Sequence, residues 1–128
     1  MRVGAEIVHT DAAPKAIGPY SQALAVGSWV FLSGQIPLDP ASGELVGGGF
    51  AGQAARALAN LDAVLTAAGC DRTAVAKVTV YLTDLARFGE FNEIYAEFFG
   101  SHRPARAVIG VAALPRGAEV EVEAVAAR

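Results

Sequence analysis

An arginine stands at the entrance of the apolar stretch RPARAVIGVAAL, residues 103–114. The guanidinium of Arg106 stays charged at any working pH, and its planar fork can hold a carboxylate through two parallel hydrogen bonds. Apolar walls beside it would strengthen that contact by excluding water. An arginine paired with a carboxylate at a strand edge is the commoner explanation of such a residue, and the sequence alone leaves both explanations open.

Carboxylates that could act as a base alternate along EVEVEAVA, residues 119–126. Glu119, Glu121 and Glu123 fall on one face of this predicted strand, and apolar residues fall on the other. A solvated acidic face is the usual explanation of such alternation. If the acidic face lies under a subunit interface, however, at least one glutamate needs a partner or a chemical role.

The spacing between these two sets of residues predicts that they do not meet within one hairpin. A hairpin closed around PRGA, residues 115–118, places Leu114 near Glu119. Arg106 then lies about six residues, or roughly 20 Å, along the partner strand from the position that faces Glu121. If both residues serve one site, either different subunits contribute them or the register differs.

Other polar residues have structural and functional interpretations side by side. The turn AIGPYSQA presents Tyr20, which could equally be a half-buried packing residue. Gly34 interrupts a strand, which indicates a bulge or a point where another molecule approaches the backbone. Asn92 sits one position from an apolar helical stripe, where a surface asparagine is ordinary.

The chain offers little for metal or thiol chemistry. Cys70 follows a helix end with no histidine nearby in sequence, which favours an inert thiol. His9 and His102 lack the context of a catalytic triad, and the spacing of these three residues fits no metal site. We therefore expect no structural metal.

The elements that must position these residues follow from periodicity. Strands are predicted at residues 6–9, 23–26, 29–36, 75–84, 107–114 and 119–126, and helices from Phe50 to about Gly69 and from about Arg87 to about Gly100. The order is β-β-β-α-β-α-β-β. This order predicts an α+β fold with a single mixed sheet and two helices on one face, in one domain that spans residues 1–128.

One predicted strand, residues 107–114, has apolar residues at both its odd and its even positions, which indicates that both of its faces are covered. Two helices cannot supply both covers. We therefore expect a second subunit on the other face of the sheet, although periodicity does not give the number of subunits.

Bulk composition excludes several classes of protein. The chain has 128 residues, of which 53% are hydrophobic, and a net charge of -3, which disfavours nucleic-acid binding. No apolar stretch has the length of a membrane span, and MRVGAEIVHT lacks the apolar core of a secretion signal. The expected location is the cytoplasm, with no membrane partner.

The motifs together resemble the reactive intermediate deaminase family, RidA, formerly called YjgF or L-PSP. The similarity runs nearly end to end and is carried by five segments: APKAIGPYSQA (13–23), FLSGQIP (31–37), FNEIY (91–95), RPAR (103–106) and LPRGAEVEVEA (114–124). It implies a chorismate-mutase-like homotrimer with sites in the clefts between subunits.

The resemblance also implies an activity and a set of site residues. Members hydrolyse 2-enamine and 2-imine acids, such as 2-aminoacrylate and 2-iminobutyrate, that pyridoxal-phosphate dehydratases release, and the products are 2-keto acids and ammonia. By position, Arg106 would bind the substrate carboxylate and Glu121 would position or activate water. The pocket would be lined by Tyr20, Ser33, Gly34, Asn92 and Val108. Val108 replaces a cysteine found in many relatives but keeps its backbone N–H.

Such chemistry needs only a held carboxylate, one water and a proton acceptor, because a protonated imine carbon is already electrophilic. It therefore implies that no metal and no cofactor are required. The leading expectation is a hydrolytic deaminase that acts in the control of metabolite damage. The alternative is a trimer that binds small molecules or acts like a chaperone without turnover. The ribonuclease activity ascribed to some relatives is disfavoured by the net acidity and by the lack of a suitable histidine or lysine pair.

Overall fold

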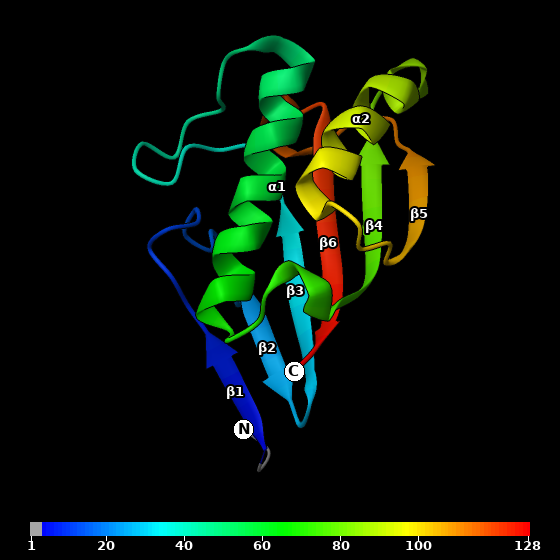
Figure 1. Ribbon diagram of the computed structural model, residues 1–128. Helices are drawn as coiled ribbons and strands as arrows, with labels where there is room; N and C mark the ends of the chain where they lie inside the picture. Colours follow the sequence, from blue (N-terminus) through cyan, green and yellow to red (C-terminus); the bar gives the residue numbers. More distant parts are fainter. Residues whose placement is uncertain (1–3) are drawn as a thin grey trace.

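The computed structural model describes residues 4–128 and shows one six-stranded sheet with two helices (Figure 1). The strands are β1 (Ala5–Val8), β2 (Ala23–Val26), β3 (Trp29–Gln35), β4 (Val75–Leu82), β5 (Ala105–Gly110) and β6 (Val120–Ala127). The helices are α1 (Gly49–Ala67) and α2 (Phe88–Phe99). Three short 3-10 turns lie at Arg72–Ala74, Leu85–Arg87 and Pro115–Gly117. The predicted α+β class and element order are confirmed.

The sheet is mixed, and its strand order is β1-β2-β3-β6-β4-β5. All neighbouring pairs are antiparallel except β4 and β5. A β4-α2-β5 unit explains that exception, because a helical crossover returns the chain to run beside its first strand in the same direction. The last strand, β6, inserts between β3 and β4 and therefore occupies the centre of the sheet.

The hairpin predicted around residues 115–118 is wrong. β5 pairs only with β4, so β4 separates it from β6. The predicted strand 107–114 also ends early, at Gly110, and residues 111–119 cross over the end of β4 to reach β6. The prediction paired consecutive strands, whereas the helical crossover had already placed β5 on the far side of β4.

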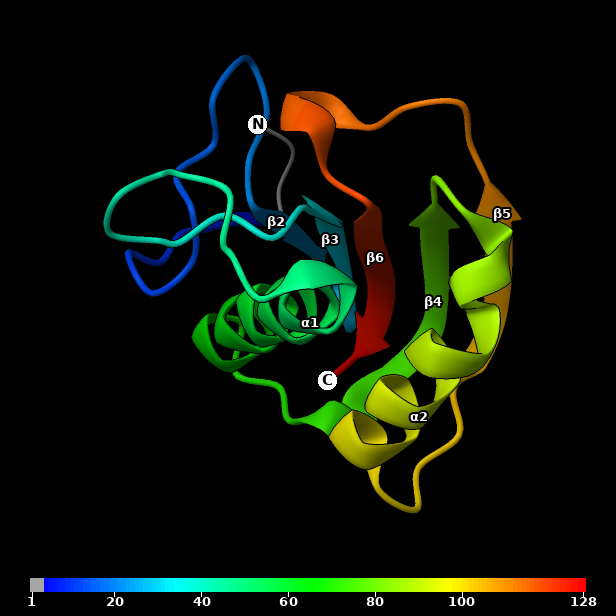
Figure 2. The same cartoon turned by 90° about the horizontal axis from the view of Figure 1, so that it is seen from above.

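Both helices cover the same face of the sheet (Figure 2). α1 packs on β3 and β6 and contacts α2. Its predicted stripe of Phe50, Ala54, Leu58, Leu61 and Leu65 is buried, and Gly69 follows the helix with a positive φ of 78°, a conformation that favours glycine at a helix end. The hydrophobic core therefore lies between these helices and one face of the sheet.

The opposite face carries large apolar side chains in the open. Trp29 and Phe31 of β3 are each 49% exposed, and Val26 of β2 is exposed beside them. This surface is centred on β2 and β3, not on the strand that sequence patterning singled out. In β5, Val108 packs against the core, whereas Ile109, which points to the other face, is exposed.

No helix within residues 4–128 combines the length and the apolarity that a bilayer crossing requires.

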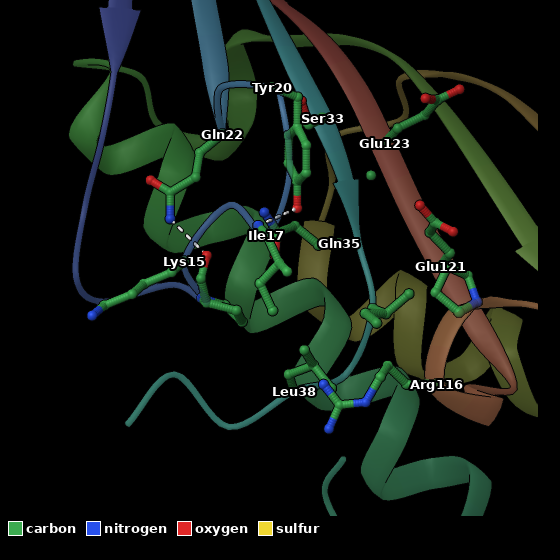
Figure 3. A pocket seen from close by; sticks show the side chains of 14 residues that line it. Lys15, Ile17, Tyr20, Gln22, Ser33, Gln35, Leu38, Arg116, Glu121 and Glu123 are labelled. Carbon is green, nitrogen blue, oxygen red and sulfur yellow. Dashed lines mark hydrogen bonds between the residues drawn. The ribbon is translucent and has the colours of Figure 1, made fainter. Parts of the chain in front are cut away.

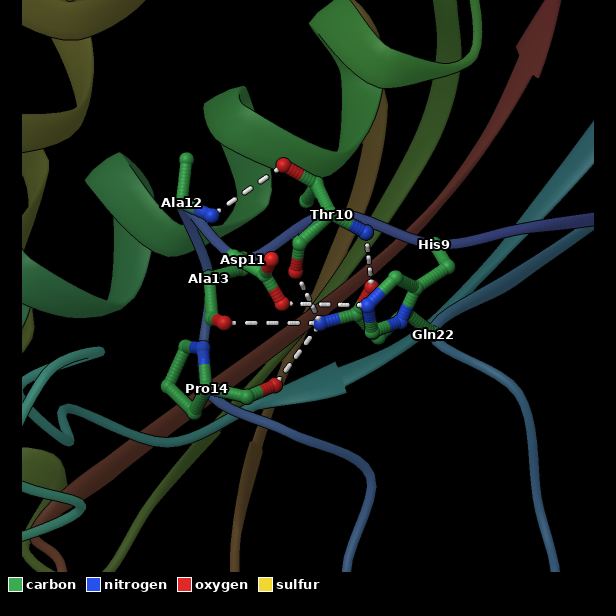
Figure 4. A network of polar contacts seen from close by, with 7 residues as sticks. All are labelled: His9, Thr10, Asp11, Ala12, Ala13, Pro14 and Gln22. Carbon is green, nitrogen blue, oxygen red and sulfur yellow. Dashed lines mark hydrogen bonds and ion pairs between the residues drawn. The ribbon is translucent and has the colours of Figure 1, made fainter.

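A buried glutamine fixes the loop between β1 and β2 (Figure 4). The side-chain oxygen of Gln22 accepts a hydrogen bond from the backbone N–H of Thr10 at 2.7 Å. Its amide nitrogen donates to the carbonyls of Thr10 at 3.0 Å and Pro14 at 2.8 Å. Backbone groups that would otherwise be buried without partners are satisfied in this way.

Replacement of Gln22 by alanine is expected to lower the free energy of unfolding by about 2–3 kcal/mol, because several buried polar groups lose their partners at once. Denaturant unfolding followed by circular dichroism measures this change. Thr10→Ala is the matched control, since Gln22 contacts only the backbone of Thr10, and its effect should stay within about 0.5 kcal/mol. Equal effects of the two substitutions would contradict this role of Gln22.

Candidate active site

A pocket of about 610 Å³ lies where the loop before β2 and the turn before β6 meet the end of β3 (Figure 3). Four of the residues singled out from the sequence line it: Tyr20, Ser33, Gly34 and Glu121. They come from the loop before β2, from β3 and from β6. The antiparallel pairing of β3 with β6 is what brings the last three together.

A β-bulge at Ser33 and Gly34 shapes the floor of the pocket. Leu32 pairs with Ala124 and Gln35 pairs with Val122, so β3 has one more residue than β6 between these two pairs. A Cβ on Gly34 would lie 2.9 Å from the carboxyl carbon of Glu121, closer than real Cβ atoms come. A side chain at position 34 would therefore displace the Glu121 carboxylate, which occupies that space.

Glu121 has the electrostatics expected of a proton acceptor. Burial, and secondly the nearby negative charge of Glu123, raise the pKa of the Glu121 carboxyl above its ordinary value. No basic side chain pairs with it among residues 4–128. A carboxylate in this setting binds a proton more readily than one in water, which suits a general base.

Glu123 lines the same pocket and is fixed by a tyrosine. The hydroxyl of Tyr81 donates a hydrogen bond to Oε1 of Glu123 at 2.7 Å. This bond, together with burial, raises the pKa of Tyr81 to about 12, so the hydroxyl keeps its proton. Sequence reasoning grouped Glu123 with Glu119 and Glu121 on one acidic strand face but did not place it among the site residues.

Tyr20 and Ser33 complete the wall of the pocket. Tyr20 is 51% exposed, and its hydroxyl accepts a weak hydrogen bond from the backbone N–H of Ile17 at 3.4 Å. The Ser33 hydroxyl donates to the carbonyl of Ser21 at 2.6 Å, which ties β3 to the loop that carries Tyr20. Half of the tyrosine surface is left free to contact a ligand.

Arg106 and Asn92 lie in a different place, a depression of about 360 Å³ between α2 and β5 at the edge of the sheet. Nη1 of Arg106 donates to Oδ1 of Asn92 at 2.8 Å. The guanidinium carbon lies 4.8 Å from the centre of the Tyr95 ring, a cation–π geometry that orients the fork. With one donor used, four N–H donors of the guanidinium are left for a ligand.

Within one chain, Arg106 and Glu121 lie on opposite faces of the sheet. Arg106 is the register partner of the buried Val78, and like Val78 it faces the helices. Glu121 is the register partner of Tyr81, whose side chain meets Glu123 on the open face. Arg106 and Glu121 therefore do not meet within one chain, although the hairpin from which their separation was predicted does not form.

The backbone of β5 offers donors at its free edge. The N–H of Val111 donates to Leu82 of β4, and alternation along the strand then turns the N–H groups of Arg106 and Val108 away from β4. The Val108 N–H singled out from the sequence is thus open to a ligand or a neighbouring chain on the same edge as the guanidinium.

Cys70 and the two histidines lie in surroundings that give them a structural role and no evident catalytic one. Cys70 is buried, and this burial raises the pKa of its thiol, as expected of an inert cysteine. His102 contacts the carbonyl oxygen of Val75 through Nε2 at 2.7 Å, and His9 contacts the exposed Asp11. Within residues 4–128, no three histidine, cysteine, aspartate or glutamate side chains gather as metal ligands would.

Two cationic residues of the large pocket were missed by sequence reasoning. Lys15 lies in the loop before β2, and Arg116 lies in the turn before β6. Both fall within segments that had been quoted as motifs, but neither residue type nor spacing distinguishes them from ordinary surface charges. Only the folding of both segments over the end of β3 places them at one pocket.

Comparison with known proteins gives a consistent set of relatives. A family model described as endoribonuclease L-PSP matches residues 10–128. Human 2-iminobutanoate/2-iminopropanoate deaminase is 53% identical over 120 residues, covering 94% of this chain and 88% of that protein. Protein DfrA of Myxococcus xanthus is 52% identical over 127 residues, covering 98% of this chain and 97% of that protein.

Solved structures agree with the fold. The crystal structure of a protein from Thermotoga maritima described as an endoribonuclease has a TM-score of 0.94 and 52% identity, covering 96% of this chain and 97% of its own. E. coli TdcF, crystallised with bound serine, has a TM-score of 0.92 and 43% identity, covering 96% and 98%. The same arrangement of strands and helices is therefore present in each of them.

Proposed function

The chain belongs to the L-PSP family, which includes the Rid proteins, and we propose that it is a hydrolytic deaminase of small 2-imine and 2-enamine acids. The observation that carries this proposal is a half-buried carboxylate, Glu121, with raised proton affinity in a pocket that has a polar wall. Similarity supports the substrate class, since human and mouse relatives at 53% identity are named 2-iminobutanoate/2-iminopropanoate deaminase. Other relatives carry other names.

We propose that the complete site forms between two copies of the chain in a homotrimer. The pocket around Glu121 opens near the uncovered apolar face, and Arg106 presents its free donors at the sheet edge. An open face with exposed Trp29 and Phe31 favours association with another subunit. A neighbouring chain whose edge meets this face would bring its Arg106 to the Glu121 pocket.

In this arrangement Arg106 and the free N–H of Val108 hold the substrate carboxylate, and Asn92 keeps the guanidinium in place. Tyr20, Ser33 and Gly34 enclose the imine carbon. Glu121 accepts a proton from a water molecule as the water oxygen bonds to that carbon, and the C=N electron pair moves to nitrogen. In the resulting carbinolamine, Glu121 returns the proton to nitrogen, the C–N bond breaks to release ammonia, and the hydroxyl proton passes to Glu121 as the 2-keto acid forms.

An enamine acid enters the same reaction after a proton moves to its carbon and gives the imine. Enzymes that eliminate water from serine or threonine on pyridoxal phosphate release such enamines. We therefore place this chain in functional partnership with that class of dehydratase, as a means of shortening the lifetime of its reactive product.

The proposal is tested by adding the protein to a threonine dehydratase and following the release of 2-ketobutyrate and ammonia. We expect faster release than with heat-denatured protein at the same concentration, because hydrolysis of 2-iminobutyrate in water limits the uncatalysed rate. Equal rates of release with native and heat-denatured protein would refute the proposed activity. If the native protein still binds a small 2-keto or 2-imino acid in that case, it is a binding trimer without turnover.

A further inference from the structure

The turn Pro115–Gly117, which leads into β6, holds an arginine in an unusual backbone conformation. Arg116 has a φ of 63°, and it is the one residue other than glycine with positive φ in the part of the chain that the structure describes. This left-handed conformation costs free energy for a residue with a Cβ and is relieved by glycine. The turn is therefore less stable with Arg116 than it would be with glycine, and it carries a long cationic side chain at this point.

That side chain lines the pocket that contains Glu121. In Figure 3, Arg116 and Leu38 lie at the end of the pocket away from Tyr20 and Ser33. Across residues 4–128 the guanidinium donates no hydrogen bond, and its one ion pair is with Glu44, at 3.8 Å. The Glu44 side chain is 76% exposed, so this pair is loose and leaves the donors of Arg116 available.

The second cationic residue of the pocket, Lys15, points its ammonium away from Arg116 and Glu121 (Figure 3). Lys15 lines the pocket from the loop before β2, and it makes no ion pair with any residue between 4 and 128. The carboxylates of Glu121 and Glu123 also line the pocket, and their charge would repel an anionic group unless cations offset it. Arg116 supplies that offset at the rim.

The dimensions of the pocket leave room beyond a four-carbon imine. Its volume of about 610 Å³ is in the range that encloses drug-sized ligands. A neutral 2-imino acid has one carboxylate, which Arg106 of a neighbouring chain would hold under the proposed function. Such a substrate makes no use of the further cation, Arg116.

We propose that Arg116 is a specificity residue that binds a second anionic group on the substrate. The favoured substrates are then 2-imino acids with an acidic side chain, such as 2-iminosuccinate, the imine formed when an oxidase removes two electrons from aspartate. This inference rests on the proposed deaminase function. Arg116 holds the side-chain carboxylate by charge-assisted hydrogen bonds.

Two imines with the same four-carbon chain test this specificity. Amino-acid oxidases with catalase generate 2-iminosuccinate from aspartate and 2-iminobutyrate from 2-aminobutyrate, and ammonia release is followed with and without the protein. The quantity compared is kcat/KM for the acidic imine divided by that for the neutral imine. Arg116→Gly removes the side chain and suits the positive φ, so this variant should fold at least as well as the native chain.

We expect this ratio to fall about tenfold in Arg116→Gly, mainly through a higher KM for 2-iminosuccinate, because a charge-assisted contact is lost. Arg116→Lys should keep the ratio within about threefold of the native value, since it retains the charge. An unchanged ratio in Arg116→Gly, with both imines still hydrolysed, overturns this specificity alone. A native protein that accelerates neither imine overturns the proposed deaminase function as well.

Discussion

Replacement of Arg106 by alanine is expected to lower kcat/KM for 2-iminobutyrate by a hundredfold or more, which corresponds to a loss of about 3 kcal/mol. The guanidinium would be the main partner of the substrate carboxylate, in a cleft from which a second chain excludes water. The loss should fall largely on KM, because the carboxylate keeps its charge from ground state to transition state. Initial rates of keto-acid release across substrate concentration measure both constants.

Two variants make the Arg106 result specific. Arg106→Lys keeps the charge but loses the planar fork and the geometry of the contact with Asn92, so a partial loss is expected. Arg72→Ala is the matched control, since Arg72 also lies over an aromatic ring, that of Phe98, and bonds to Asp62 outside both pockets. If Arg72→Ala and Arg106→Ala retain the same activity, Arg106 does not bind the substrate.

Replacement of Glu121 by glutamine is expected to lower kcat by about 10²–10⁴-fold, the usual contribution of a general base. The substitution keeps the size of the side chain and therefore the packing against Gly34. Because burial and Glu123 raise the pKa of Glu121, the native rate should fall, as pH is lowered, at a higher pH than an ordinary glutamate would impose. This limb of the pH–rate profile should vanish in Glu121→Gln.

The raised pKa of Glu121 also predicts that Glu121→Gln, which lowers activity, increases the stability of the folded protein. A carboxyl whose pKa is raised by folding contributes stability that is fully present below its unfolded pKa and is lost as pH rises through its folded pKa. Ionised Glu121 is therefore unfavourable at neutral pH, and Glu121→Gln should melt at a higher temperature than the native protein. The difference should shrink below about pH 4. A lower Tm for Glu121→Gln at neutral pH would contradict the raised pKa.

Glu123→Gln separates the two carboxylates. It removes the negative charge beside Glu121, so the acidic limb of the rate profile should move to lower pH while turnover persists. If Glu123→Gln instead abolishes turnover and Glu121→Gln does not, the general base has been assigned to the wrong glutamate.

Local patterns in the sequence were sufficient for the elements but not for their pairing. β2 was predicted with its observed bounds, and Ser33-Gly34 was identified as a candidate bulge from a glycine inside a strand. The partner of β5 was wrong because strand order depends on where α2 returns the chain, and periodicity within a strand carries no such information. The observed strand order excludes the predicted hairpin, but the candidate site residues stay the same.

The division of the site was foreseen only in part. The separation of Arg106 from Glu121 was inferred from distance along a hairpin. In the structure the two side chains are separated because they point to opposite faces of the sheet, as do their partners on β4, Val78 and Tyr81. Arg116 was invisible because a positive φ and a place at the pocket rim belong to the folded turn and not to the residue type.

The central claim is that one active site takes Arg106 from one chain and Glu121 from another, and mixing two inactive variants tests it most directly. Arg106→Ala and Glu121→Gln chains are unfolded together in equal amounts and refolded, and mixed assemblies are verified by distinguishable tags. In a randomly assembled closed ring, about half of the sites receive an intact Arg106 and about half receive an intact Glu121. About a quarter of the sites therefore contain both intact residues, and about a quarter of native activity should return. Mixed assemblies no more active than either variant alone would show that each site draws both residues from one chain, contrary to this account.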